Sequence, residues 1–204
     1  SSTIKLTING QSATYDISKF AYSSKELVQL QTYLGEKEVL EDFLSNIRAD
    51  DTILDVGAHI GLYTCLSSNI VSEGQVVAIE PNDAWGGQLQ RNIQLNNDSA
   101  VSHIPVLLGD GSDETVTAEN LFSERDLSSP NIIKIDVDGM EVAVLEGLKS
   151  ILRDDQCRRV YVEVHPQLLE DDEPTKVVEY LIDAGFTTTR LTDRSDEYMI
   201  RGTK

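Results

Sequence analysis

From residue 52 onward, short apolar segments alternate with segments of helical periodicity, and this alternation limits the chain to few folds. The apolar segments are bounded by glycines and polar residues, which is typical of buried strands. We predict strands at 52–56, 75–80, 101–107, 131–136, 158–165, 186–191 and 197–201. We predict helices at 62–71, 84–96, 141–152 and 174–184. Repeated strand–helix units form a mostly parallel sheet with helices on both faces, so the sequence predicts an α/β fold.

The first 46 residues precede this alternation. Asn9 and Gly10 lie between two segments of alternating polarity, which predicts a β-hairpin. Residues 24–46 have the pattern of one or two helices interrupted near Gly35. The length of 204 residues fits one domain. We therefore expect a single domain over 1–204, with 1–46 as a hairpin and helical extension and 47–204 as the ligand-binding core.

The chain is strongly acidic. It carries 35 acidic and 17 basic residues, which gives a formal net charge of −18. A surface this negative repels phosphate backbones and anionic lipids, so we expect no nucleic-acid partner and no membrane partner. The acidity is spread along the chain. It suits either ordinary solubility or adaptation to high salt, where counter-ions screen the repulsion.

The expected location is the cytoplasm. The longest apolar runs are too short to cross a bilayer, and we expect no secretory signal before the fold. Cys65 and Cys157 are the only cysteines. One falls in a predicted helix and the other in a predicted loop, which suits a reducing compartment without a disulfide framework.

Polar side chains end four of the predicted strands. They are Asp55, Glu80, Asp136 and the pair Glu163 and His165. In open parallel sheets, ligands bind beyond the carboxyl ends of the strands. Burying these groups at that edge without partners would be costly. The sequence therefore predicts a ligand pocket there.

The segment ILDVGAHIGLYT, residues 53–64, indicates what the pocket binds. A strand, a glycine turn and a helix together offer backbone amides to a polar ligand. Its Asp-x-Gly-x-x-x-Gly pattern lacks the dense glycines of the dinucleotide fingerprint, and Asp55 would repel a pyrophosphate. Glu80 follows at the spacing of an acid that accepts hydrogen bonds from ribose hydroxyls. A ribose with an ammonium-bearing tail describes S-adenosylmethionine better than NAD.

These motifs make the chain similar to the FkbM family of class I S-adenosylmethionine-dependent methyltransferases. The matching segments are ILDVGAHIGLYT, VVAIEPN (76–82), NIIKIDVDGMEVAVLEGLKSIL (131–152) and VYVEVHP (160–166). The resemblance covers most of residues 36–190. It implies a seven-stranded Rossmann-like sheet, S-adenosyl-L-methionine as the cofactor, and methyl transfer, usually to a hydroxyl oxygen. Because family members act on sugars and natural products, the implied partner is a small-molecule acceptor with a hydroxyl group.

The predicted cofactor-binding residues lie in the glycine turn and after four strands. They are Asp55, Gly57, His59, Gly61, Glu80, Pro81, Asp110 and Asp136. Asp55 is assigned to the amino-acid end of the cofactor, Glu80 to the ribose, and Asp110 to the exocyclic amine of adenine.

Each assignment has a structural alternative. Asp55 and Asp110 can be turn formers, because Asp hydrogen-bonds nearby backbone amides. The glycines can serve tight packing of a strand against a helix. Glu80 can cap the following helix, and His59 can be an exposed turn residue.

The candidate catalytic residues are His165, Asp136 and Glu163. Their two strands are expected to be neighbours about 4.8 Å apart, so Asp136 and His165 can face the same small volume. Histidine titrates near neutrality and suits removal of a hydroxyl proton, so His165 is the first choice as base. Asp136 can instead orient the imidazole or act as the base itself. A divalent metal held by Asp136 and His165 is an alternative, but the acids have no recognisable metal-ligand spacing, and no metal is predicted.

Two further charged residues near these strand ends have structural interpretations. Lys134, Asp136 and Asp138 alternate along one strand and so lie on one face. A lysine in an apolar strand is costly unless paired, which predicts a salt bridge to a neighbouring acid. Glu141 is interpreted as a first-turn acid that stabilises its helix through the dipole.

Three other functions remain as alternatives to methylation of a hydroxyl on a small molecule or sugar. A catalytically inactive protein of the same fold would keep the cofactor site. An NAD-dependent oxidoreductase is disfavoured by the missing third glycine and by Asp55. A nucleic-acid methyltransferase is disfavoured by the charge and by DVDG (136–139), which stands in place of an Asn/Asp-Pro-Pro-aromatic motif.

Overall fold

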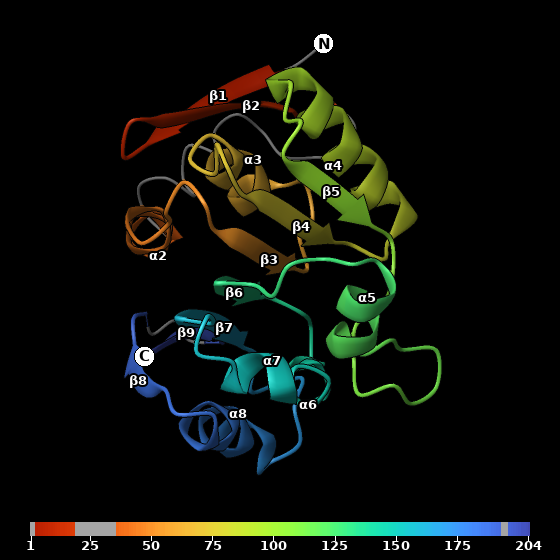
Figure 1. Ribbon diagram of the computed structural model, residues 1–204, viewed down its shortest axis with the longest axis vertical. Coiled ribbons are helices and arrows are strands. Elements are labelled where there is room, and N and C mark those ends of the chain that lie inside the picture. The colour runs from red at the N-terminus through yellow and green to blue at the C-terminus, as the bar shows by residue number, and fades with distance from the viewer. Residues whose placement is uncertain (1–2, 19–35, 193–195) are drawn as a thin grey trace. The chain divides into compact units, whose positions relative to one another are not determined.

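The computed structural model describes residues 3–18, 36–192 and 196–204 (Figure 1). Its larger sheet contains β3 (Thr52–Val56), β4 (Gln75–Ile79), β5 (Val101–Ile104), β6 (Ile132–Ile135), β7 (Arg159–Val164), β8 (Thr187–Arg190) and β9 (Tyr198–Thr203). The strand order is β5-β4-β3-β6-β7-β9-β8. The β3–β6, β4–β5 and β6–β7 pairs are parallel, and β9 is antiparallel to both β7 and β8. The predicted seven-stranded, mostly parallel Rossmann-like sheet is confirmed.

Contacts divide the chain into two compact units. The first contains Ser1–Asp51 and Ala58–Pro105, and the second contains Thr52–Gly57 and Val106–Lys204. The predicted division into 1–46 and 47–204 remains a prediction.

The first unit begins with the predicted hairpin of β1 (Thr3–Ile8) and β2 (Gln11–Asp16), joined by Asn9 and Gly10 at positive φ. One end of the hairpin lies beside one end of α4 (Asp83–Asn96) in Figure 1. Two side-chain amides of α4 hold it there. Asn92 accepts from the backbone N–H of Asp16, and Asn96 both accepts from and donates to the backbone of Thr14. These hydrogen bonds give partners to backbone N–H and C=O groups of β2.

Two more helices complete this unit among the residues that the structure describes. These are α2 (Glu36–Ser45) and α3 (Leu62–Ser68). The helix predicted within 24–46 is present from Glu36 onward, and the predicted part at 24–35 lies outside the described residues. The core lies between α3, α4 and the strands, where Cys65, Leu66, Leu89 and the four residues Val76–Ile79 are buried.

The second unit contains α5 (Ala118–Glu124), α6 (Glu141–Glu146), α7 (Lys149–Arg153) and α8 (Glu173–Asp183). Pro174 lies in the first turn of α8, and Gly185 follows its end at φ 92°. The proline at the start of the helix and the glycine after its end therefore lie where the sequence predicts them.

The predicted helix at 141–152 is two short helices that break at Gly147 and Leu148. A Cβ atom at Gly147 would lie 1.9 Å from the carbonyl oxygen of Gly109, so no side chain fits at this break. The sequence reasoning also missed α5. It is a single short segment, although Thr117 caps it by accepting from the N–H of Asn120. No helix within the described ranges is long and apolar enough to cross a membrane.

Candidate functional site

The second unit brings together the three residues predicted to be catalytic. In the parallel pairing of β6 with β7, Ile135 lies opposite Val162. Asp136 and Glu163 are the next residues on the two strands and so meet at the carboxyl end of β6. Together with His165, they place one ligand atom each within 4.8 Å of one another.

Lys134 forms the salt bridge that the sequence predicted. Its side chain is 3% exposed, and its Nζ lies 3.0 Å from Oδ2 of Asp136. Burial alone would raise the pKa of Asp136, but the Lys134 ammonium and a hydrogen bond with Glu163 outweigh it and lower that pKa. Asp136 is therefore held ionised.

His165 is oriented by Glu141, which is completely buried. Oε1 of Glu141 lies 2.7 Å from Nδ1 of His165 and also accepts the backbone N–H of His165 at 3.1 Å. Because a carboxylate only accepts, the proton of the ring is placed on Nδ1. The other ring nitrogen, Nε2, lies 3.5 Å from Oε2 of Glu197 and 3.9 Å from one oxygen each of Asp136 and Asp138.

The hydrogen bond to Glu141 raises the pKa of His165 to about 9; burial opposes this rise, and the carboxylates of Asp136, Glu141 and Glu163 add to it. At neutral pH the imidazole is therefore protonated. His165 was the first choice as base because the ordinary histidine pKa lies near neutrality, and in this state of the protein its pKa lies above that range. The identity of the proton acceptor remains a prediction.

Two residues of this cluster were missed as site residues by the sequence reasoning. Glu141 was interpreted through its helix alone, and its contact with His165 depends on how α6 packs beside β7. The position of Glu197 depends on the sheet topology. β9 pairs antiparallel with β7, and Tyr198 lies opposite Val164, so Glu197 comes to lie beside His165. No local spacing in the sequence signals either contact.

Asp55 and Gly57 end β3 in the same unit. Asp55 is 1% exposed and lies opposite Lys134 in the β3–β6 register. Gly57 has φ 81°, and a Cβ atom there would lie 1.9 Å from the carbonyl oxygen of Asp136. Gly57 is thus required for the close approach of two backbones, which supports the packing alternative for this glycine.

In the first unit, Glu80 joins the glycine turn to the end of β4. Its side chain is buried, with Oε2 accepting the N–H of His59 and Oε1 accepting the N–H of Asn82, both at 2.9 Å. The capping role considered for Glu80 is filled by Asn82, which accepts from the N–H groups of Ala84 and Trp85 at the start of α4. Pro81, between the two, is exposed.

His59 and Gly61 form the rest of the turn. His59 adopts φ 52° and is half-buried, with its ring centroid 3.7 Å from that of Trp85. It is therefore not the fully exposed turn residue considered as the alternative. A Cβ atom at Gly61 would lie 2.6 Å from Leu89 of α4, so this glycine also has a packing role.

Asp110 lies in an exposed turn of the second unit. Its Oδ1 accepts from both the N–H and the hydroxyl of Ser112, and these bonds lower the pKa of Asp110. The turn-forming alternative accounts for these contacts, and the adenine contact remains a prediction.

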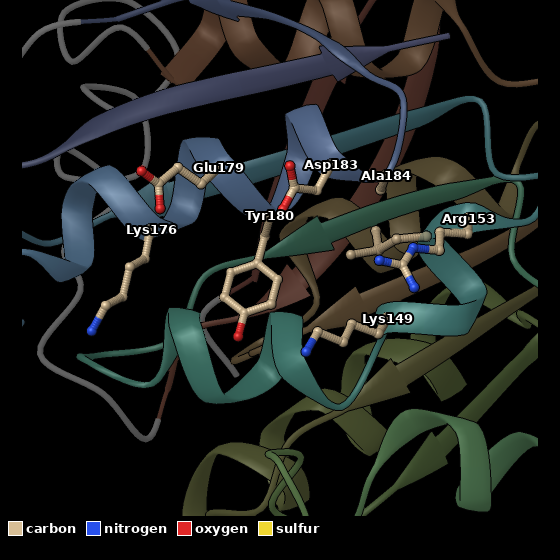
Figure 2. Close-up of a pocket in the computed structure, with 8 residues that line it drawn as sticks. Lys149, Arg153, Lys176, Glu179, Tyr180, Asp183 and Ala184 are labelled. Atoms are coloured by element: carbon tan, nitrogen blue, oxygen red, sulfur yellow. The ribbon is translucent and has the colours of Figure 1, made fainter.

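A separate cavity of about 310 Å³ lies between α7 and α8 (Figure 2). Lys149 and Arg153 from α7 and Lys176 and Tyr180 from α8 project around it. Lys149 is paired with Glu146, and Lys176 with Asp172. The cavity contains none of the predicted site residues.

The pattern that defines the methyltransferase FkbM domain matches residues 112–188. The chain is 25% identical over 219 residues to the hexuronic acid methyltransferase AglP of Haloferax volcanii, covering 95% of this chain and 86% of AglP.

Two solved structures show the same fold. The precorrin-6y C5,15-methyltransferase of Geobacter metallireducens matches with a TM-score of 0.63 and 19% identity, over 93% of this chain and 96% of that one. A methyltransferase FkbM of Methylobacillus flagellatus matches with a TM-score of 0.64 and 14% identity, over 76% of this chain and 44% of that one. The domain match and the AglP relative confirm the resemblance to FkbM methyltransferases that the motifs indicate, and the two structures show the fold alone.

Proposed function

We propose that the chain transfers a methyl group from S-adenosylmethionine to an oxygen of a sugar, with a hydroxyl as the acceptor. The observation that carries this proposal is the cluster of Asp136, Glu163 and His165 at the carboxyl ends of β6 and β7. Ligands of open α/β sheets bind at that end, and the cluster offers groups that can hold a hydroxyl and take its proton.

The residues of the glycine turn fit the proposed cofactor. Two backbone amides fix the carboxylate of Glu80, and each oxygen keeps a second lone pair for a ribose hydroxyl. Asp55 is proposed to act on the ammonium end of the cofactor. The bound sulfonium supplies an activated methyl group, so the protein has to align the acceptor and accept one proton.

The acceptor class is supported by the relative AglP, whose name specifies a hexuronic acid. The fold does not select the acceptor atom, because the precorrin enzyme of the same fold is named as a C5,15-methyltransferase. A hexuronic acid offers two kinds of oxygen, hydroxyl and carboxylate. Only the hydroxyl needs a group that takes its proton, and the cluster provides such groups.

Transfer of labelled methyl from S-adenosylmethionine to a panel of sugars tests the proposal. The panel pairs hexuronic acids with the neutral hexoses of the same configuration. We expect label in a hexuronic acid, in an ether that survives mild alkali. Label that mild alkali removes would be a methyl ester, and this result would contradict the hydroxyl as acceptor.

The catalytically inactive alternative makes a different prediction for the same assay. It requires cofactor binding without transfer to any member of the panel. The NAD-dependent alternative requires heat on titration with NAD and none with S-adenosylmethionine.

A further inference from the structure

The acids around His165 outnumber the bases near them. Five carboxylates surround Lys134 and His165 among the residues that the structure describes. They are Asp136, Asp138, Glu141, Glu163 and Glu197. Of these, Glu141 and Glu163 are buried, whereas Asp136 and Glu197 are partly exposed and Asp138 is largely exposed. Even with both bases protonated and one proton shared between Asp136 and Glu163, the cluster keeps a negative charge. This excess favours a bound cation in addition to the Lys134 ammonium.

The orientation of His165 is that of a metal ligand. Metal-binding histidines donate one ring N–H to a carboxylate, which fixes the ring and leaves the other nitrogen for the ion. Glu141 plays this part here: it is completely buried and lies 2.7 Å from Nδ1. The second oxygen of Glu141 has no hydrogen-bond partner in the described part of the chain. Glu141 therefore adds buried negative charge directly behind the imidazole.

The distances from Nε2 of His165 to the nearby carboxylates fit an ion bound between them better than direct hydrogen bonds. Nε2 lies 3.5 Å from Glu197 and 3.9 Å from Asp136. Both distances exceed the range of about 2.7–3.2 Å that hydrogen bonds from a nitrogen to an oxygen usually span. Two ligand atoms that each lie about 2.1 Å from one ion are at most about 4.2 Å apart. Both distances fall inside that limit, and one ligand atom each of Asp136, Glu163 and His165 lies within 4.8 Å of the others.

We propose that Asp136, Glu163 and His165 bind a divalent transition-metal cation, with Glu197 as a further oxygen ligand. The mixture of one imidazole with carboxylates suits Zn²⁺ or Mn²⁺ better than Ca²⁺ or Mg²⁺, which prefer oxygen alone. No local spacing in the sequence signals this site, because its ligands come from the ends of three different strands.

The use of this cation rests on the proposed function. In methyl transfer to a hydroxyl, the bound cation would polarise the acceptor oxygen and lower the pKa of the hydroxyl, and the proton would pass to a carboxylate oxygen of the cluster that does not hold the cation. For a hexuronic acid it also offsets the repulsion between the acceptor and the acidic cluster. The existence of the site rests on the geometry alone.

The chain has three histidines, His59, His103 and His165, which gives an internal control. Zn²⁺ is added to the metal-free full chain in 1 M KCl, which suppresses weak binding to the acidic surface. The ring nitrogens are followed by NMR and assigned with His59→Gln and His103→Gln. We expect one equivalent of Zn²⁺ to shift Nε2 of His165 and to leave the other two rings unchanged. An unchanged His165, or equal shifts in all three rings, would overturn the proposal.

Glu163→Gln supplies a second measurement, with Asp171→Asn as the matched control. Asp171 is an exposed acid of the same unit, and its replacement changes the net charge equally. Glu163→Gln should weaken Zn²⁺ binding at least about tenfold, and Asp171→Asn should leave it unchanged. Equal affinities in the two variants would contradict the site. If Glu163→Gln does not fold, the NMR result on the unmodified cluster decides alone.

Binding of S-adenosylhomocysteine separates this proposal from the proposed function. A chain that binds S-adenosylhomocysteine while Zn²⁺ leaves His165 unchanged loses the cation site and keeps the methyltransferase proposal. A chain whose His165 binds Zn²⁺ but that binds no S-adenosylhomocysteine keeps the cation site, and the proposed function fails.

Discussion

At the scale of single residues, the cluster at the end of β6 is the feature with the most direct chemical consequence. Asp136 is held ionised by Lys134, and His165 is held in one orientation by Glu141. An acceptor hydroxyl placed between these groups would meet a proton acceptor at a fixed position.

Replacing His165 should therefore reduce turnover and spare cofactor affinity, and Asp136→Asn is measured in parallel. Loss of a positioned general base costs about 10²–10⁴-fold in rate. We expect a fall of that size for Asp136→Asn, and for His165→Ala above about pH 9, where the imidazole is neutral. Both are measured by release of S-adenosylhomocysteine with the acceptor found in the sugar panel. Wild-type turnover in both variants would place the base elsewhere, with Glu163 as the next candidate, or mean that alignment alone drives the reaction.

Cys157 gives a prediction of pH dependence away from the site. Burial raises the pKa of this thiol from 9.0 to about 12. A raised pKa means that the unfolded chain loses the proton first. Stability is therefore intact below about pH 9 and falls as pH rises toward 12, by about 1.4 kcal/mol per pH unit.

Urea unfolding at several values from pH 8 to pH 10.5 measures this effect. Cys157→Ala serves as the reference, because it removes the thiol and keeps every other titrating group. The free energy of unfolding of the wild type should fall more steeply with pH than that of the variant. Parallel slopes would show that the pKa of the thiol is not raised by burial.

The sequence predicted which residues meet at the cluster better than it predicted the side chains that contact them. Asp136 and His165 could be placed together because strand ends in a parallel sheet share one edge. The contacts of Glu141 and Glu197 could not, since they depend on helix packing and on the antiparallel insertion of β9 between β7 and β8. The pKa of His165 depends on those same partners, and so it too was beyond the sequence.

At the scale of elements, one predicted helix is divided at a glycine that lies against a distant segment. The periodicity at 141–152 is continuous, yet Gly147 meets the backbone of Gly109 and the helix breaks there. The strands were predicted to within a few residues. The buried strands β3, β4, β6 and β7 are mostly apolar, whereas β8 is largely exposed. The hairpin followed from its Asn-Gly turn between two segments of alternating polarity.

The turn after β3 should tolerate no side chain at Gly57. Its φ is positive, and a Cβ atom there would lie only 1.9 Å from the carbonyl oxygen of Asp136, so both the conformation and the available space oppose Gly57→Ala. We expect a loss of at least about 3 kcal/mol in the free energy of unfolding.

Gly87 supplies the control for this substitution. It lies inside α4, and a Cβ atom there would have nothing within 4 Å. Gly87→Ala should stabilise the protein by about 0.5–1 kcal/mol, because alanine has the higher helix propensity. Urea unfolding of both variants checks the pair, and equal effects would contradict the close approach of the two backbones at Gly57.

At the scale of the whole molecule, the net charge of −18 sets the response to salt. If the acidity reflects a saline environment, the thermal midpoint should rise steadily from low salt to molar KCl, since screening relieves the self-repulsion. Differential scanning calorimetry over that range tests this. A flat midpoint would leave ordinary solubility as the explanation.

The claim that S-adenosylmethionine is the cofactor is central to the proposed function, and isothermal titration of the full chain tests it most directly. S-adenosylmethionine or S-adenosylhomocysteine should bind, and NAD and NADP should give no heat. Glu80→Ala should weaken that binding by about one to two orders of magnitude, because charge-assisted hydrogen bonds to the ribose are lost. Asp83→Asn, an exposed acid at the start of α4, is the matched control and should bind as the wild type does. Tight binding of NAD, or a Glu80→Ala variant with wild-type affinity, would contradict this claim.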